Sequence, residues 1–325
     1  MYGRLAAEPV SLGRIRAHES VAGWPTSYSR QMRARSIAFL VLIVLSGVTD
    51  ARRVFAQTAT TSTFDILSGD ASVRARFFAA QGGTPLATVL IVPGWGGDSL
   101  DASGMGALLS ARRVNVLLIN FRGVQQSTGR FTYANAIDDL GFAWRWLRDP
   151  ANRTRYQLDP SKLILAGNSF GGGVAMVYAA RDTTVTRVIS IVGADHGVLA
   201  RRLNTDTAYA STLRSRLAAT EAPRGPVRFD AMEAVDEIRR RERDNDLVRL
   251  APHLDHRAVL LVGGWDDMTA PIESEILPVY RALAARAGAD ATILAYPAGH
   301  SLRTQRDRIA DDIVAWLVKR LPPGV

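Results

Sequence analysis

From Phe64 onward the chain alternates short apolar runs with longer segments of helical periodicity, and this alternation restricts the possible folds more than any other feature. Val89–Val92 and Leu163–Ala166 are continuous apolar runs, as in strands buried on both faces. Strands that alternate with helices form a mostly parallel sheet covered by helices on both faces, so we expect an α/β fold. The expected strands are Phe64–Leu67, Val73–Ala79, Val89–Val92, Val114–Asn120, Leu163–Ala166, Val188–Val192, Val259–Val262 and Thr292–Ala295, the first two as an antiparallel edge hairpin, and the expected helices are Met105–Arg112, Tyr133–Arg148, Val174–Ala180, Ile272–Arg286 and Arg306–Leu321.

The stretch at about 195–250 interrupts this alternation. It is rich in Arg and Ala, has a helical tendency and contains no clear strand. We interpret it as a small helical lid inserted into one domain that spans residues 57–325.

A basic and apolar segment near the N-terminus predicts export. Arg33 and Arg35 precede the apolar run Ile37–Val48. Val54–Ala56 then supplies the compact residues that a signal peptidase reads. The apolar run is short for a transmembrane helix, which needs about 20 such residues. We expect residues 32–56 to be a signal peptide of a periplasmic or secreted protein, with an uncleaved anchor or a buried helix as alternatives.

Residues 1–31 show no such pattern. Met32 directly precedes the basic residues, so we predict that translation begins there and that residues 1–31 are a non-native extension or disordered. A native peptide from residues 1–31, found by N-terminal sequencing of the precursor, would contradict this.

The net charge of +9 does not predict a nucleic-acid partner. Residues 1–56 hold eight Arg against three acidic residues, a balance of +5, which leaves 9 − 5 = +4 for the rest. The remaining basic residues are scattered, without a basic stripe interleaved with aromatics. The chain has no Cys, which excludes disulfides, thiolate metal sites and a Cys nucleophile. The expected partner is a small-molecule ester or amide, with a membrane only if the N-terminal segment stays uncleaved, and the oligomeric state is left open.

The segment Gly167–Gly171 has the sequence G-x-S-x-G and directly follows the strand Leu163–Ala166. A serine exposed on a sharp strand-to-helix turn needs glycines two residues before and after it, because side chains there would collide. Ser169 is therefore a candidate nucleophile. The alternative is a phosphate-binding turn, but the segment lacks the Lys of a P-loop and does not fit G-x-G-x-x-G.

A base and an acid follow in the order that such a nucleophile requires, serine first, then Asp or Glu, then His. Asp266 and Asp267 follow the strand Val259–Val262, and His300 follows Thr292–Ala295. Each therefore lies at the carboxyl edge of the sheet, where open α/β sheets build their sites. Either aspartate could hold His300, and Asp195 is a third candidate. The alternative for His300 is that it only caps a turn.

Two backbone amides are candidates for an oxyanion hole. One is the amide of Phe170, next to the nucleophile, and the other is the amide of Trp95 in the glycine-rich turn Pro93–Gly97. Glycines let main chain approach a substrate closely. The same glycines would equally suit a simple tight turn.

These motifs, in this order, resemble the α/β-hydrolase superfamily, and most closely its dienelactone-hydrolase-like and prolyl-oligopeptidase-like branches. In those families the acid lies three residues after a glycine and four before a proline, which implies Asp267, with Asp266 and Asp195 as alternatives. Two positions depart from the family pattern: Pro93 replaces a usual His, and Asn120 replaces a usual Asp. The resemblance covers roughly Val89 to Leu321 and rests on Pro93–Gly97, Asn120–Gly123 with Ser127 and Gly129, Gly167–Gly171, Gly264–Pro271 and Gly299-His300.

The resemblance implies a serine hydrolase in which Ser169 attacks, His300 acts as base and Asp267 orients it. No metal or organic cofactor is expected. Hydrolysis of small to medium carboxylic esters is the first expectation. The alternatives are a peptidase or amidase of the prolyl-oligopeptidase type, without its usual propeller domain, and a non-catalytic binding protein of the same fold.

Overall fold

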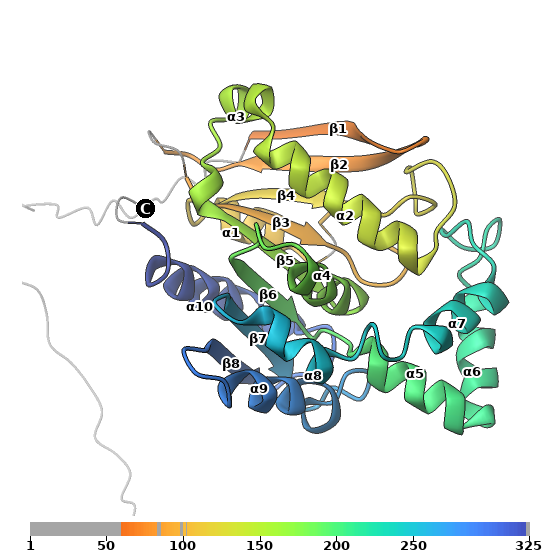
Figure 1. Cartoon of the computed structure of the whole chain (residues 1–325). Coiled ribbons are helices and arrows are strands. Elements are labelled where there is room, and N and C mark those ends of the chain that lie inside the picture. The colour runs from red at the N-terminus through yellow and green to blue at the C-terminus, as the bar shows by residue number, and fades with distance from the viewer. Residues whose placement is uncertain (1–59, 83–85, 98–99, 102, 323–325) are drawn as a thin grey trace, which may run out of the picture. The chain divides into compact units, whose positions relative to one another are not determined.

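The computed structural model describes residues 60–82, 86–97, 100–101 and 103–322, all within one compact unit, Phe55–Val325. Eight strands form one sheet in the order β1-β2-β4-β3-β5-β6-β7-β8 (Figure 1). The pairs β1–β2 and β2–β4 are antiparallel, and all other neighbouring strands are parallel. This confirms the predicted α/β fold with an antiparallel hairpin at one edge. The strands are β1 Thr60–Ser68, β2 Ala71–Ala79, β3 Thr88–Val92, β4 Asn115–Ile119, β5 Leu163–Asn168, β6 Arg187–Ile191, β7 Ala258–Gly264 and β8 Asp290–Tyr296.

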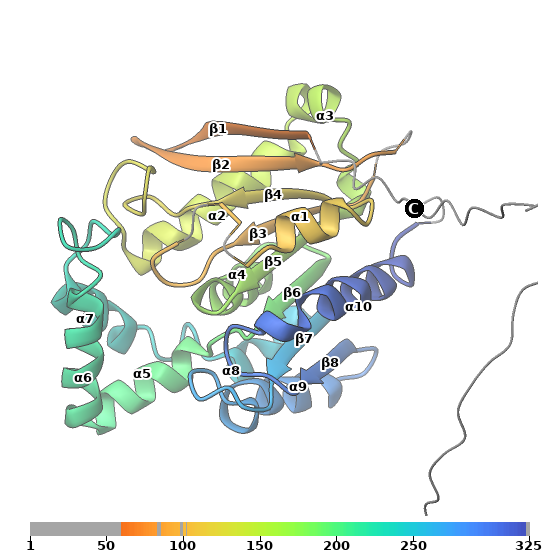
Figure 2. The same ribbon diagram turned by 180° about the vertical axis from the view of Figure 1, so that it is seen from behind.

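Helices cover both faces of the sheet (Figures 1 and 2). Every residue of β3 and β4 is buried, because alternate side chains pack into two different hydrophobic cores. Leu90 belongs to the core that includes residues of α2, α4, α8 and α9, whereas Ile91 belongs to the core that includes residues of α1 and α10. None of the described helices is long and apolar enough to cross a membrane. The helices are α1 Met105–Ser110, α2 Tyr133–Arg148, α3 Pro150–Tyr156, α4 Phe170–Arg181, α5 His196–Thr205, α6 Thr207–Ala218, α7 Ala231–Arg240, α8 Leu247–Leu250, α9 Leu277–Ala284 and α10 Arg306–Val318.

Two helical segments differ from the expectation. Helix α2 ends at Arg148 as predicted, but Pro150 begins a further helix, α3, which was not among the expected helices. Proline is favoured in a first helical turn, and the Asp149 side chain caps α3 by accepting from the amides of Ala151 and Asn152. The predicted helix Ile272–Arg286 is instead a π-helical turn, η3, followed by α9.

The segment between β6 and β7 contains α5, α6, α7 and α8, followed by the short 3-10 turn η2, Ala251–Leu254. Aspartates begin its helices: Asp195, Asp206, Asp230 and Asp246 each accept hydrogen bonds from amides in the first turn that follows. Figure 1 shows α5, α6 and α7 grouped beside the sheet, away from the C-terminus. The segments 1–31 and 32–56 lie outside the described residues.

Candidate active site

The turn between β5 and α4 holds Ser169 in a strained conformation, with φ 53° and ψ −120°. A non-glycine residue at positive φ is sterically costly and is found where the surrounding structure enforces it. Here the enforcement is close backbone packing. A Cβ added to Gly167 would lie 2.0 Å from the carbonyl oxygen of Gly171, and one added to Gly171 would lie 2.3 Å from that of Pro93. Glycine at these two positions therefore allows the turn to form.

Three side chains from three loops meet at this turn. The Nε2 atom of His300 lies 2.8 Å from Oγ of Ser169, and its Nδ1 atom lies 2.7 Å from Oδ2 of Asp267. Ser169 follows β5, Asp267 follows β7 and His300 follows β8, so the parallel strands bring them to the same edge of the sheet. The structure thus joins serine, imidazole and carboxylate in one hydrogen-bonded chain.

The Asp267 carboxylate is fully buried and held on both oxygens. Its Oδ1 accepts from the amides of Thr269 and Ala270, at 2.8 and 3.0 Å, and its Oδ2 faces His300. Burial alone would raise the pKa of Asp267, but the bonds from His300, Ala270 and Thr269 outweigh it and the pKa lies below its usual value. An ionised Asp267 favours the proton on Nδ1 of His300, which leaves Nε2 to accept from the Ser169 hydroxyl.

The two other candidate acids lie elsewhere. Asp266 is exposed, and its backbone amide donates to the carbonyl of Ala298 at 3.1 Å. Asp195 is buried at the start of α5, where its carboxylate accepts from the amides of Gly197, Val198 and Leu247. Of the three aspartates, Asp267 is the one whose carboxylate contacts His300.

The glycine-rich turn after β3 lies against Ser169. A Cβ on Gly94 would be 3.3 Å from Cβ of Ser169, and Gly97 closes the turn by donating to the carbonyl of Gly94 at 3.1 Å. Trp95 and Phe170 pack edge to face across this junction, with ring centroids 5.7 Å apart. Because Phe170 is the first residue of α4, its amide has no partner within the helix. The turn therefore brings the backbone next to Trp95 close to Ser169, and Phe170 follows the serine directly.

A cavity of about 320 Å³ opens beside these residues. Ser169, His300 and Asn168 lie on one part of its wall. Ser103 and Arg306 also line it, and both belong to the side of the sheet covered by α1 and α10. No described residue of the 195–250 segment lines this cavity.

The 195–250 segment instead holds the Trp95 indole. Nε1 of Trp95 donates to Oγ1 of Thr220 at 3.0 Å, and the Trp95 ring packs edge to face on Phe229 with centroids 5.1 Å apart. Phe131 packs on the same indole at 5.0 Å. The segment therefore supports the turn that carries Trp95.

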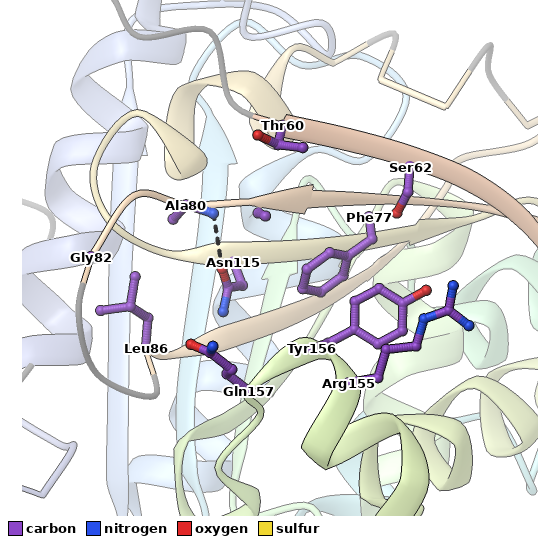
Figure 3. A pocket seen from close by; sticks show the side chains of 11 residues that line it. Thr60, Ser62, Phe77, Ala80, Gly82, Leu86, Asn115, Arg155, Tyr156 and Gln157 are labelled. Carbon is purple, nitrogen blue, oxygen red and sulfur yellow. Dashed lines mark hydrogen bonds between the residues drawn. The ribbon is translucent and has the colours of Figure 1, made fainter.

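A second cavity, of about 300 Å³, lies at the opposite edge of the sheet (Figure 3). It is lined by Phe77, Tyr156 and Arg155, and by Asn115 at the amino end of β4. No histidine is among its described lining residues. Of these two cavities, only the one beside Ser169 has both a serine and a histidine among its described lining residues.

A buried tyrosine–histidine pair beneath the site was not singled out from the sequence. The Tyr133 hydroxyl lies 2.8 Å from Nδ1 of His196, and the His196 ring packs on Phe170 at 4.8 Å between centroids. Burial lowers the pKa of His196 to about 3 and raises that of Tyr133. Both side chains are therefore uncharged near neutral pH, and the His196 ring supports the Phe170 ring.

A carboxyl pair behind the triad was also missed. Oε2 of Glu275, in the turn η3 (Ile272–Ile276), accepts from the Asp195 backbone amide at 2.6 Å. Burial raises the pKa of Glu275 to about 7 and that of Asp195 to about 6. No local pattern signals such a pair, because its members lie 80 residues apart in sequence. Among the described residues, no group of three or more His, Cys, Asp or Glu side chains could hold a metal ion.

Comparison with known proteins bears on the fold. A family model described as the alpha/beta hydrolase fold matches residues 87–225. No curated protein matches the sequence. Solved structures that resemble the chain include the α/β hydrolase GrgF from Penicillium sp. sh18, with 17% identity and a TM-score of 0.58 over 81% of this chain and 99% of that one.

Two further similar structures are esterases by name. The esterase from Pyrobaculum calidifontis is 19% identical, with a TM-score of 0.54 over 80% of this chain and 87% of that one. The esterase Pf2001 from Pyrococcus furiosus is 14% identical, with a TM-score of 0.57 over 81% and 91%. At these identities the likeness establishes the fold.

Proposed function

We propose that this chain, which has the α/β-hydrolase fold, is a serine hydrolase that cleaves carboxylic esters. The observation that carries the proposal is the hydrogen-bonded chain from Ser169 through His300 to Asp267 at the carboxyl edge of the sheet. The esterases among the structurally similar proteins favour ester hydrolysis over peptide hydrolysis.

The first half of the reaction forms an acyl-enzyme. His300 takes the Ser169 proton on Nε2 while Oγ attacks the ester carbonyl carbon. The carbonyl oxygen becomes an oxyanion that the amides of Trp95 and Phe170 stabilise. The intermediate collapses, the bond to the alcohol oxygen breaks, and His300 returns the proton to the departing alcohol.

The second half regenerates the enzyme. His300 deprotonates a water molecule, which attacks the acyl carbon, and Ser169 leaves as a hydroxyl after recovering the proton from His300. Ionised Asp267 stabilises the imidazolium that exists during both proton transfers.

The triad spacing also supports a finer assignment within the superfamily. Asp267 lies three residues after Gly264 and four before Pro271, the spacing of the dienelactone-hydrolase-like and prolyl-oligopeptidase-like branches. We propose that the segment at 195–250, expected as a lid, acts on the site by supporting Trp95, and that residues 32–56 are an export signal. Fractionation of cells that express the full chain would contradict export if the mature protein stayed in the cytoplasm.

A covalent probe tests the main proposal. A fluorophosphonate should label the wild-type protein and leave Ser169→Ala unlabelled, because the probe reacts with an activated serine hydroxyl. Absence of labelling in folded wild-type protein would favour a binding protein of this fold. A panel of p-nitrophenyl esters and aminoacyl amides then separates esterase from peptidase, and faster turnover of the amides would overturn the ester assignment.

A further inference from the structure

We infer that the cavity beside Ser169 takes an ester that carries a carboxylate, and that Arg306 binds this carboxylate. The inference rests on the proposed ester hydrolysis and names its substrate class. Arg306 is the first residue of α10, is partly buried, and lines the same cavity as Ser169 and His300.

The charge balance of the cavity favours an anion. Arg306 is the one Lys or Arg among the described lining residues, and no Asp or Glu is among them. Neighbouring arginines do have partners: Arg112 pairs with Asp311 at 2.6 Å, and Arg308 lies 3.9 Å from Asp312. Within the described part of the chain, Arg306 forms no ion pair or side-chain hydrogen bond. A partly desolvated guanidinium without a partner is unfavourable, and a bound anion would compensate it.

The position of the guanidinium fits a ligand-binding role. A Cβ built on Gly104 would lie 3.9 Å from Nη1 of Arg306, so the guanidinium reaches across to the start of α1. Ser103, the residue before Gly104, lines the same cavity and offers a hydroxyl donor there. An arginine presents parallel N–H groups that match the two oxygens of a carboxylate.

The size and lining of the cavity restrict the rest of the substrate. Its volume of about 320 Å³ is at the lower end of the range of ligand pockets. Ile91, Leu118 and Ile119 give part of the wall an apolar surface. A short aliphatic segment between ester and carboxylate suits this wall. The substrate class is therefore a half-ester of a short dicarboxylic acid or an acyl ester of a short hydroxy acid.

Matched substrates that differ only in charge test the inference. Monoethyl succinate and ethyl succinamate place a carboxylate or its neutral carboxamide on the acyl side. Acetoxyacetate and acetoxyacetamide do the same on the alcohol side. For one of the two pairs, the wild-type kcat/KM, followed by pH-stat, should favour the carboxylate by on the order of tenfold or more, as expected for a charge-assisted hydrogen bond.

Variants of α10 assign the preference to one side chain. Arg306→Gln should reduce the carboxylate-to-carboxamide ratio of kcat/KM by on the order of tenfold or more, and Arg306→Lys should retain part of it. Arg308→Gln, which removes an exposed arginine from the same helix, should keep the wild-type ratio. This control separates local recognition from a general charge effect.

Three results would overturn the inference: a wild-type ratio of one or less in both pairs, no turnover of either carboxylate, or an unchanged ratio in Arg306→Gln. Fluorophosphonate labelling of Ser169 in every protein keeps these results distinct from a failure of the proposed function. A protein that labels but ignores the carboxylate remains a serine hydrolase without this specificity.

Discussion

The Trp95 indole donates its N–H to the Thr220 hydroxyl at 3.0 Å, which links the turn beside Ser169 to the 195–250 segment. Thr220 in turn donates to the carbonyl of Leu217 at 2.7 Å, at the end of α6. Three aromatic rings also pack edge to face with the indole, those of Phe131, Phe170 and Phe229. The position of a proposed oxyanion amide therefore depends on a segment that does not line the cavity.

Thr220→Val should weaken catalysis without blocking binding. The substitution keeps the side-chain volume but removes the acceptor, so the free energy of unfolding should fall by about 1 kcal/mol. The kcat should fall by on the order of tenfold, less than for complete loss of an oxyanion donor, with little change in KM. Thr212→Val is the matched control, because the exposed Thr212 hydroxyl bonds only to Ala208 of its own helix. An unchanged kcat in Thr220→Val would show that the link is only structural.

Asp267→Asn should lower kcat by on the order of 10⁴-fold, because the amide can no longer hold His300 in the reactive tautomer. Asp266→Asn, at the adjacent exposed position, should change kcat by less than about twofold. Steady-state kinetics on one p-nitrophenyl ester compares the two. A larger loss in Asp266→Asn would assign the acid to Asp266 and contradict the hydrogen bonding of the structure.

Glu275→Gln should stabilise the protein above neutral pH and have little effect below about pH 5. Burial raises the pKa of Glu275 to about 7, so its protonated form is favoured in the folded state. A carboxyl group with a raised pKa contributes stability at low pH that is lost as the pH rises through that value. Removing the ionisable group should therefore add roughly 1 to 2 kcal/mol to the free energy of unfolding at pH 8.

Urea denaturation at several pH values measures this difference. Glutamine keeps an oxygen that can accept from the Asp195 amide, so the hydrogen bond is retained. Glu273→Gln, at an exposed position of the same turn, is the control and should give a difference that stays near zero. If the difference between Glu275→Gln and wild type did not vary with pH, folding would leave the pKa of Glu275 unchanged, which would contradict the prediction.

Tyr133→Phe should destabilise the fold by about 1 to 3 kcal/mol, because it leaves Nδ1 of the buried His196 without its partner. Tyr156→Phe is the matched control, since the Tyr156 hydroxyl forms no hydrogen bond with the described residues and its ring contacts are retained. If the two substitutions lowered the free energy of unfolding equally in chemical denaturation, the Tyr133–His196 hydrogen bond would make no net contribution to stability.

Much of the architecture could be predicted from local patterns. Val89–Val92 and Leu163–Ala166 are strands because continuous apolar runs suit a sheet buried on both faces, and both lie within β3 and β5. The expected helix Tyr133–Arg148 has the bounds of α2, but α3 was not among the expected helices, although Asp149 and Pro150 are typical of a helix start. The helix predicted over Ile272–Arg286 begins instead as a π-helical turn, and Pro278 near the start of α9 has no N–H to continue a regular ladder.

The sequence by itself determined the order of elements and the loops that carry serine, acid and histidine, because these depend on short-range periodicity and on glycine at the elbow. Only the tertiary structure decided which aspartate faces His300, since Asp266 and Asp267 are neighbours and just one of them turns inward. It alone also revealed the links from Trp95 to Thr220 and from Asp195 to Glu275, which span 125 and 80 residues. Such contacts form only when distant segments are packed together, so no local pattern encodes them.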